Sequence, residues 1–213
     1  MQRVAVIDYG MGNLHSVARA LQWVAGDMRV LVTQIPEEVA AAERVVFPGQ
    51  GAIGVCRREL ERLGLLSVVA AAAREKPFFG MCLGPQFLME RSEEDGGVSG
   101  LGVFPGEVCR FPDPLLASDG SRCKVPHMGW NRVHRTQDHE LWKGIPQDAW
   151  FYFVHSYYLR PAQPGAVIAT TEHGIGFASA IARDNVFAVQ FHPEKSAAHG
   201  LRLLQNFLNW SPV

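Results

Sequence analysis

The stretch of sequence that decides the fold is Phe78-Phe79-Gly80-Met81-Cys82-Leu83-Gly84-Pro85-Gln86. It opens with apolar residues typical of a buried strand, and a segment from Gln86 to Arg91 has helical character. The spacing Gly-x-Cys-x-Gly is the thiol counterpart of the Gly-x-Ser-x-Gly elbow of hydrolases, where small residues let a strand and a helix approach closely. We therefore expect a sharp strand-to-helix turn with Cys82 exposed at its apex.

Such a turn would make Cys82 a nucleophile. The start of the following helix supplies unpaired N–H donors and a partial positive charge, which favour a thiolate and an oxyanion formed after attack. Pro85 fits the first helical turn, because its missing N–H costs nothing there. A lone cysteine is more often a small buried hydrophobe. That interpretation holds for Cys56, Cys109 and Cys123, which lack these surroundings and are expected to be free thiols.

The base that such a thiol needs is found near the end of the chain. The apolar run 186–191 leads into His192-Pro193-Glu194. Pro193 disfavours helical geometry at the residue before it, and residues two apart in an extended chain point to the same side. Glu194 can then hold the imidazole of His192 while its other nitrogen faces a thiol. His-x-Glu alone is a weak signal, but combined with the elbow it predicts the catalytic triad Cys82, His192 and Glu194.

The first half of the chain alternates short apolar runs with segments of helical periodicity. Leu14, Val17, Ala18 and Leu21, for example, recur at the spacing of one helix face. Strands that alternate with helices indicate a parallel sheet covered on both faces. The expected strands are 4–7, 30–32, 45–47 and 77–80, and the expected helices are 14–21, 60–74 and 86–91.

The second half of the chain is rich in β-strand residues. Residues 111–124, with two prolines, two aspartates and a glycine, are typical of an exposed loop. Strands are expected at 150–159, 166–171 and 177–183, and Asp184-Asn185 forms a hairpin turn into 186–191. A final helix at 197–210 should bury Leu201, Leu204, Phe207 and Leu208. We expect one α/β domain over 1–213, with a mostly parallel central sheet flanked by helices and an antiparallel β extension.

Composition and charge narrow the classes of function. The 213 residues are 47% hydrophobic and include 20 basic and 21 acidic side chains, a net charge of −1 without long runs of one sign. Nothing here favours a nucleic-acid or membrane-surface partner. The apolar run at the N-terminus is too short for a signal peptide, so we expect a cytoplasmic protein. No His-Glu-x-x-His or comparable set predicts a metal site, and no cofactor is expected.

With the elbow and His-Pro-Glu assembled, the chain resembles the class I (triad) glutamine amidotransferase family. The resemblance covers nearly the whole chain and is closest to the glutaminase subunits of imidazole glycerol phosphate synthase. It implies a flavodoxin-like fold. Two departures from the family pattern are Pro85, where relatives carry a larger residue, and the 111–124 loop. The motifs that carry the resemblance are Asp8-Tyr9-Gly10-Met11-Gly12-Asn13-Leu14, Phe47-Pro48-Gly49-Gln50-Gly51-Ala52, Gly80-Met81-Cys82-Leu83-Gly84, His127-Met128-Gly129-Trp130-Asn131, Tyr152-Phe153-Val154-His155-Ser156-Tyr157 and Gln190-Phe191-His192-Pro193-Glu194.

The resemblance implies a role for each matched residue. Cys82 would attack the amide of glutamine, and His192, oriented by Glu194, would protonate the ammonia and then activate water. Backbone N–H groups of Gly51, in the segment Pro48-Gly49-Gln50-Gly51, and of Leu83 would form the oxyanion hole. The residues implied to bind glutamine are Gln86, Ser156 and Tyr157.

The resemblance also implies a partner. In the family, ammonia passes through a tunnel to a separate cyclase subunit, a (β/α)8 barrel, in a heterodimer that serves histidine biosynthesis. Two of the matched positions also have a purely structural interpretation, since Trp130 could be a core aromatic residue and Lys195 a solvated surface charge. The residues matched to the partner-facing positions are Asn13, Trp130, Tyr152 and Lys195.

Other functions compete with this one. The chain could supply ammonia to another synthase, such as one that makes anthranilate, aminodeoxychorismate or a modified sugar. It could also be a regulatory scaffold that keeps the fold, although the intact triad opposes this. A dinucleotide-binding turn at Gly10-Met11-Gly12 is rejected, because His15 stands where the fingerprint needs a third small residue.

Overall fold

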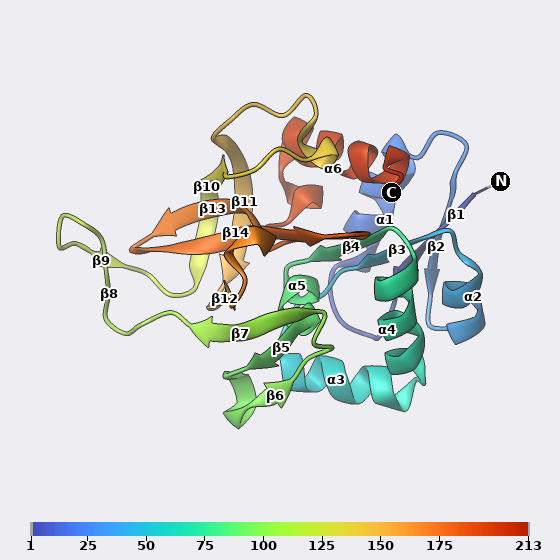
Figure 1. The fold of residues 1–213 in the computed structure, drawn as a ribbon, viewed down its shortest axis with the longest axis horizontal. Helices are drawn as coiled ribbons and strands as arrows, with labels where there is room; N and C mark the ends of the chain where they lie inside the picture. Colours follow the sequence, from blue (N-terminus) through green and yellow to red (C-terminus); the bar gives the residue numbers. More distant parts are fainter. Residues whose placement is uncertain (1, 213) are drawn as a thin grey trace.

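A computed structural model describes residues 2–212 and is built around one long, twisted sheet (Figure 1). At one end of this sheet five neighbouring strands all run parallel to one another. These strands are almost entirely buried apart from the edge strand, which explains why their sequences read as continuous apolar runs. In spatial order they are β2 (Arg29–Thr33), β1 (Arg3–Ile7), β3 (Arg44–Phe47), β4 (Phe78–Met81) and β15 (Val186–Val189).

Helices cover both faces of the parallel strands. Because side chains of a strand alternate between faces, Val4 and Val6 of β1 join one core and Ala5 and Ile7 join the other. The first core is covered by α1 (Leu14–Val24) and α6 (Ala197–Asn209). The second is covered by α2 (Pro36–Ala41), α3 (Ile53–Arg62), α4 (Leu65–Glu75) and α5 (Leu83–Leu88).

Beyond β15 the sheet becomes mainly antiparallel. A hairpin joins β14 (Ile175–Arg183) to β15 through Asp184 and Asn185, as the sequence predicts. The order continues through β12 (Tyr157–Pro161), β7 (Phe104–Arg110), β5 (Met89–Ser92) and β6 (Val98–Ser99), and only β5 and β7 run parallel.

A branch of the sheet leaves from β14. There β13 (Val167–His173) pairs with both β14 and β10 (His127–Arg135), which in turn pairs with β11 (Ala149–His155). Short 3-10 turns lie at Glu94–Gly96, Glu140–Trp142, Pro164–Ala166 and Pro193–Lys195. The expected fold class is confirmed. In the described range, no helix is both long and apolar enough to cross a bilayer.

Besides the strand expected at 150–159, which is divided at Ser156 into β11 and β12, four of the expected segments differ from the structure. The helix expected at 60–74 is broken into α3 and α4, because Gly64 adopts a φ of +68°. The helix expected from Gln86 to Arg91 instead begins at Leu83 and ends at Leu88, since the backbone from Met89 onward pairs with β7. The 111–124 loop contains a small hairpin, β8 (Leu115–Leu116) and β9 (Arg122–Cys123), which projects from the body (Figure 1).

The last helix is the fourth difference. Leu204, Phe207 and Leu208 are buried as expected, but Leu201 is only partly buried and Leu203 points inward in its place. The buried stripe therefore begins with the small Gly200, where the helix passes close to the Pro193 carbonyl.

The break between α3 and α4 leads to a test of backbone strain. A Cβ at position 64 would meet no neighbouring atom, so the only cost of Gly64→Ala is the strain of an alanine in the left-handed backbone conformation. We expect a loss of about 1 kcal/mol in the free energy of unfolding, measured by urea denaturation. Gly165→Ala is the matched control, because its surroundings are equally open and its φ is not positive. An equal loss in both variants would contradict the account.

Candidate active site

The elbow at Cys82 is a strained turn between β4 and α5. Cys82 has a φ of +54° and a ψ of −92°, a region that residues with a side chain rarely occupy. Its backbone N–H donates to the Val189 carbonyl of β15 at 2.9 Å, which holds the turn at the end of the parallel strands. Strain of this kind persists only where the surrounding structure enforces it, and it is concentrated at functional sites.

The two glycines of the motif are explained by close packing. A Cβ at Gly84 would overlap the Phe47 carbonyl oxygen of β3. A Cβ at Gly80 would lie 3.0 Å from the Cβ of Ala188 and 3.2 Å from the Pro85 nitrogen. The expected need for small residues is therefore confirmed at both positions.

The sulfur of Cys82 is less exposed than the sequence suggests. The residue is only 7% exposed, because β11 crosses over the elbow and brings the Val154 carbonyl oxygen to 4.0 Å from Sγ. The expectation of an exposed apex is wrong in this respect. Cys82 instead lines two hollows, a large pocket and a small cavity.

His192 and Glu194 form a buried pair. The Nδ1 of His192 lies 2.8 Å from Glu194 Oε1, and the two side chains are 3% and 1% exposed. His192 is extended, as expected before Pro193, but the expectation that the segment stays extended to Glu194 is wrong, because residues 193–195 form a 3-10 turn. The turn is held by the Ser196 hydroxyl, which donates to the His192 carbonyl at 2.6 Å.

The other ring nitrogen of His192 is not occupied by Glu194, which bonds only Nδ1. Within residues 2–212, its Nε2 is buried and has no hydrogen-bond partner. His192, Glu194 and Cys82 line the same small cavity, together with Asn13 and the segment Pro48–Gln50. Burial alone would lower the pKa of His192, but the negative charges of Cys82 and Glu194 outweigh burial and raise it to about 10. Pairing with the sulfur and the carboxylate therefore favours the protonated form of the imidazole.

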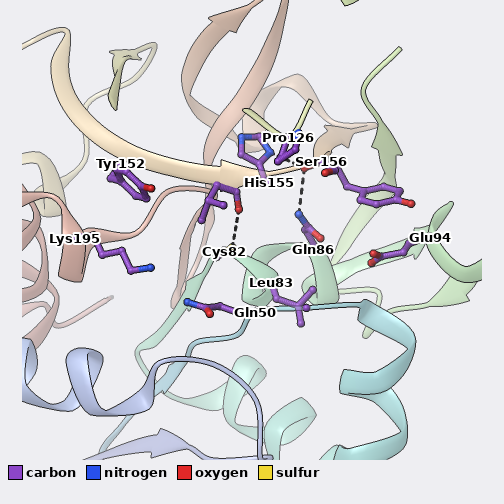
Figure 2. Close-up of a pocket in the computed structure, with 13 residues that line it drawn as sticks. Gln50, Cys82, Leu83, Gln86, Glu94, Pro126, Tyr152, His155, Ser156 and Lys195 are labelled. Carbon is purple, nitrogen blue, oxygen red and sulfur yellow. Dashed lines mark hydrogen bonds between the residues drawn. The ribbon is translucent and has the colours of Figure 1, made fainter. Parts of the chain in front are cut away.

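A pocket of about 490 Å³ opens on the other side of Cys82 (Figure 2). It brings together residues from α5, β11, the start of β12 and the 50–51 segment. Seven of the residues singled out from the sequence line it with Cys82, namely Gly51, Leu83, Gln86, Tyr152, Ser156, Tyr157 and Lys195.

Two predicted partner-facing residues lie outside this pocket. Asn13 caps α1, where its side chain accepts from the Ser16 N–H, and lines the small cavity. Trp130 is 49% exposed on β10 and packs edge-on against Tyr152, with ring centroids 6.3 Å apart. The Nζ of Lys195 lies 5.8 Å from the Tyr152 ring centre. The interpretation of Trp130 as a core residue is therefore wrong.

Hydrogen bonds determine how Gln86 faces the pocket. Its Nε2 donates to the Tyr157 carbonyl and to Gln190 Oε1, both at 3.2 Å. Gln190 is fully buried and donates in turn to the Cys82 carbonyl at 3.3 Å. Gln190 thus connects the pocket wall at Gln86 to the elbow at Cys82. No sequence pattern indicated this role, although Gln190 stands in one of the motifs that carry the resemblance.

Two further pocket residues were missed. Glu94 contributes a half-buried carboxylate, and its Oε2 accepts from the Ile53 N–H at 2.9 Å. Burial raises the pKa of Glu94. Its acidic neighbours in sequence are typical of a solvated surface, so no pattern singles it out. His155 stands in one of the motifs that carry the resemblance but received no role there, yet it is buried and lines the pocket.

The segment expected to form the oxyanion hole is packed against Tyr9. The Tyr9 hydroxyl donates to the Pro48 carbonyl at 3.1 Å and fills the space where a Cβ of Gly49 would lie. Gly51 has a φ of +91° and lines the pocket. Leu83 begins α5, so its N–H belongs to the first turn, which the helix cannot satisfy internally.

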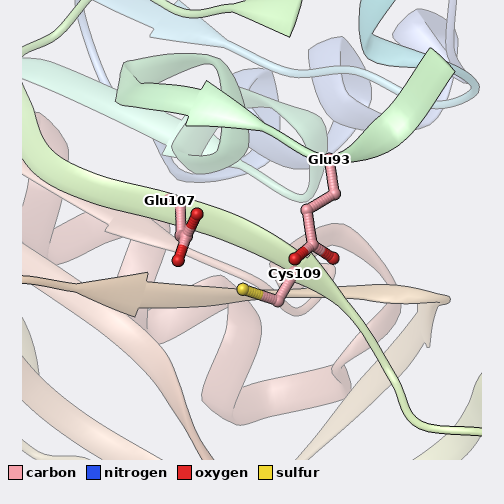
Figure 3. A group of neighbouring side chains, drawn as sticks. All are labelled: Glu93, Glu107 and Cys109. Carbon is pink, nitrogen blue, oxygen red and sulfur yellow. The ribbon is translucent and has the colours of Figure 1, made fainter. Parts of the chain in front are cut away.

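One group of metal-binding side chains occurs in the described residues. Glu107 and Cys109 of β7 lie close to Glu93, which directly follows the neighbouring strand β5 (Figure 3). Glu107 is paired with Arg91 and Arg160, and Glu93 accepts from the Arg110 N–H at 3.0 Å. Burial raises the pKa of Cys109 to about 11, so it is a thiol at neutral pH. These groups are already satisfied and make a poor metal site.

The charge pairing at the elbow can be tested by titration. In Cys82→Ser the sulfur that helps to raise the His192 pKa is lost, so this pKa should fall from about 10 toward its ordinary value. Proton NMR of the imidazole ring measures this directly. Cys123→Ser, which removes a thiol outside both cavities, is the control. An unchanged His192 pKa in Cys82→Ser would contradict the coupling.

Comparison with known proteins agrees with this geometry. The glutamine amidotransferase class-I family profile matches residues 5–210. The imidazole glycerol phosphate synthase subunit HisH of Aromatoleum aromaticum is 58% identical over the full length of both chains. HisH of Methylococcus capsulatus is 57% identical, over all of this chain and 98% of its own.

Solved structures show the same fold at low identity. A glutamine amidotransferase superimposes with a TM-score of 0.70 at 19% identity, over 97% of both chains. PurLQS from Thermotoga maritima superimposes with a TM-score of 0.67 at 16% identity, over 98% of each. The chain therefore belongs to the class I glutamine amidotransferase family, and within it groups with HisH, the imidazole glycerol phosphate synthase subunit.

Proposed function

We propose that the chain hydrolyses glutamine to glutamate and ammonia with Cys82, His192 and Glu194, and passes the ammonia to a separate cyclase. One observation carries the proposal. A strained cysteine at a helix N-terminus shares a cavity with a histidine whose far nitrogen is bonded to a buried carboxylate. This is the arrangement of nucleophile, base and orienting group that acyl transfer requires.

The reaction proceeds in two balanced steps. Cys82 Sγ attacks the carboxamide carbon, the C–N bond breaks, and His192 gives its Nε2 proton to the leaving nitrogen, which departs as ammonia. A water then attacks the thioester and gives one proton to His192, the C–S bond breaks to release the thiolate, and the new γ-carboxyl group loses the second proton to solvent as glutamate departs. Glu194 keeps the Nδ1 proton of His192 in place throughout, so that Nε2 is the nitrogen that exchanges protons.

The charge that develops on the carbonyl oxygen needs fixed N–H donors. The Leu83 N–H at the start of α5 supplies one, supported by the helix dipole. The second comes from the Pro48–Gly51 segment, in which Gly51 supplies the N–H. Tyr9 anchors the start of this segment through the Pro48 carbonyl.

The pocket offers different chemistry on the two sides of Cys82 (Figure 2). Glu94 and Gln86 lie on one side, where the carboxylate suits the α-ammonium of glutamine, together with backbone at Ser156 and Tyr157. Tyr152 and Lys195 lie on the other side. Glutamine binds on the Glu94 side, and ammonia leaves past Lys195.

The partner is a (β/α)8 barrel cyclase, which binds the face that carries Trp130. Large apolar side chains gather there, with Met128 64%, Trp130 49% and Trp150 46% exposed. Exposed apolar patches of this kind mark protein interfaces. Both HisH relatives are named as subunits of a synthase and match this chain along its length, which supports a heterodimer with a separate synthase chain.

We take residues 1–213 as one glutaminase domain, of which Met1 and Val213 lie outside the described residues.

The partner can be tested by activation. The isolated chain should hydrolyse glutamine slowly, and addition of the barrel cyclase with its nucleotide ligand should accelerate hydrolysis strongly. A high rate that no cyclase changes would contradict the proposal. Affinity capture from a cell extract identifies the partner independently, and recovery of a chorismate-using enzyme instead would assign the chain to another synthase.

The triad can be tested by substitution in the activated complex. Cys82→Ser and Glu194→Gln should each reduce kcat by about a thousandfold or more, because the three groups act as a unit. Cys123→Ser and Glu75→Gln remove the same groups at positions outside the pocket and should leave kcat unchanged. Full activity in either triad variant would remove that residue from the mechanism.

A further inference from the structure

Two buried histidines face each other behind the pocket. His127 of β10 and His155 of β11 are direct partners in the antiparallel register and are only 4% and 6% exposed. His127 Nδ1 lies 3.0 Å from His155 Nε2. The catalytic steps proposed above use neither ring, although His155 lines the glutamine pocket.

The direction of this hydrogen bond follows from its surroundings. His155 Nδ1 lies 2.7 Å from the Tyr157 carbonyl oxygen, which can only accept, so Nδ1 carries a proton. Burial lowers the pKa of His155 to about 4 and that of His127 to about 3, so both rings are neutral at neutral pH. His155 Nε2 is then an acceptor, and His127 Nδ1 is the donor.

The chain of hydrogen bonds continues one step back from His127, to Asn131. The second nitrogen of neutral His127, Nε2, accepts from the Asn131 amide nitrogen at 3.1 Å. That amide also donates to the Glu172 carbonyl at 2.9 Å. The His127 ring is stacked between Phe153 and His173, at centroid distances of 4.7 and 4.0 Å. Every bond from Asn131 to Tyr157 thus runs in one direction, and the ring planes are held by packing.

The chain of bonds ends on a group that orients the pocket wall. The Tyr157 carbonyl accepts both from His155 and from Gln86 Nε2. Gln86 uses its two amide hydrogens on Tyr157 and Gln190, so its Oε1 is left to face the pocket as an acceptor. His155 also spans the break between β11 and β12 at Ser156, because it bonds the carbonyl two residues ahead.

We propose that His155, oriented by His127, is a positioning residue for glutamine: it fixes the Ser156–Tyr157 backbone and thereby the direction in which Gln86 presents its amide oxygen. This inference rests on the proposed function. Neither histidine touches the reacting atoms, so their loss should weaken glutamine binding more than it slows the chemical steps.

The kinetic test compares two substitutions at one position, in the complex with the barrel cyclase. His155→Leu removes the donor to Tyr157 and should raise the KM for glutamine about tenfold, with kcat changed less than about threefold. His155→Asn places an amide nitrogen near the position of Nδ1 and should restore KM to within about threefold of the unmodified complex. His134→Leu, at an exposed position of the neighbouring strand β10, is the matched control and should change neither constant.

The tautomers of His155 and His127 provide a second measurement, which a purely structural role for these rings would not determine. Nitrogen NMR of the histidine rings at pH 7 should show His155 protonated on Nδ1, and His127 protonated on Nδ1 as well. In His127→Leu the His155 ring loses its donor, and the KM should rise, whereas His127→Asn keeps a donor there. This second pair of variants preserves the test if His155→Leu does not fold.

The outcomes separate the inference from the function on which it rests. If the unmodified complex does not hydrolyse glutamine, the proposed function and the inference both fail. If it does, and a folded His155→Leu or His127→Leu keeps the original KM, the inference alone is overturned. A His155 ring protonated on Nε2 would likewise overturn it. Equal KM values in His155→Leu and His155→Asn would show that the hydrogen bond to Tyr157 is not the cause.

Discussion

The backbone of Cys82 is the constraint on which the site depends. A cysteine with a positive φ costs roughly 1–3 kcal/mol, and that cost is met by neighbours that leave the chain no easier path. The Val189 carbonyl holds its N–H, and Gly80 and Gly84 let β15 and β3 pack against both sides of the turn. The consequence is chemical. The sulfur is held at the start of a helix, between a cavity that contains His192 and a pocket that admits substrate.

The two halves of the sheet make different contributions to this site. The parallel half places the elbow and the 192–194 turn at the ends of adjacent strands, β4 and β15, so that residues 110 apart in sequence become neighbours. The antiparallel half supplies the opposite wall, where β11 passes over the sulfur and gives way to β12 at Ser156. Buried amide and imidazole groups join the two halves, through Gln86 and Gln190. Buried hydrogen-bond networks of this kind favour one arrangement of a polar wall.

The sequence predicts the parts of this arrangement that depend on local geometry. The elbow at Cys82, the pairing of His192 with Glu194, and the hairpin before them are all short-range features with a steric or hydrogen-bonding cause. The prediction was wrong where long-range pairing decides the outcome. Residues 89–92 join β7 in the sheet, although their sequence is compatible with a helix. Glu94 and the His127–His155 pair could not be recognised, because their roles arise only when distant strands meet. At Pro193 the sequence predicts the extended backbone of His192 and its pairing with Glu194, but not the 3-10 turn that brings the two side chains together.

The central claim is that Cys82 carries the glutamyl group during the reaction. It is tested most directly by acid quenching of the cyclase-activated chain during turnover of glutamine, followed by digestion and mass spectrometry. We expect a glutamyl adduct on the peptide that contains Cys82, and none on the peptides of Cys56, Cys109 or Cys123, whose thiols lie outside both cavities. Steady hydrolysis of glutamine with an adduct on another cysteine, or with no adduct under conditions that trap thioesters, would contradict the account.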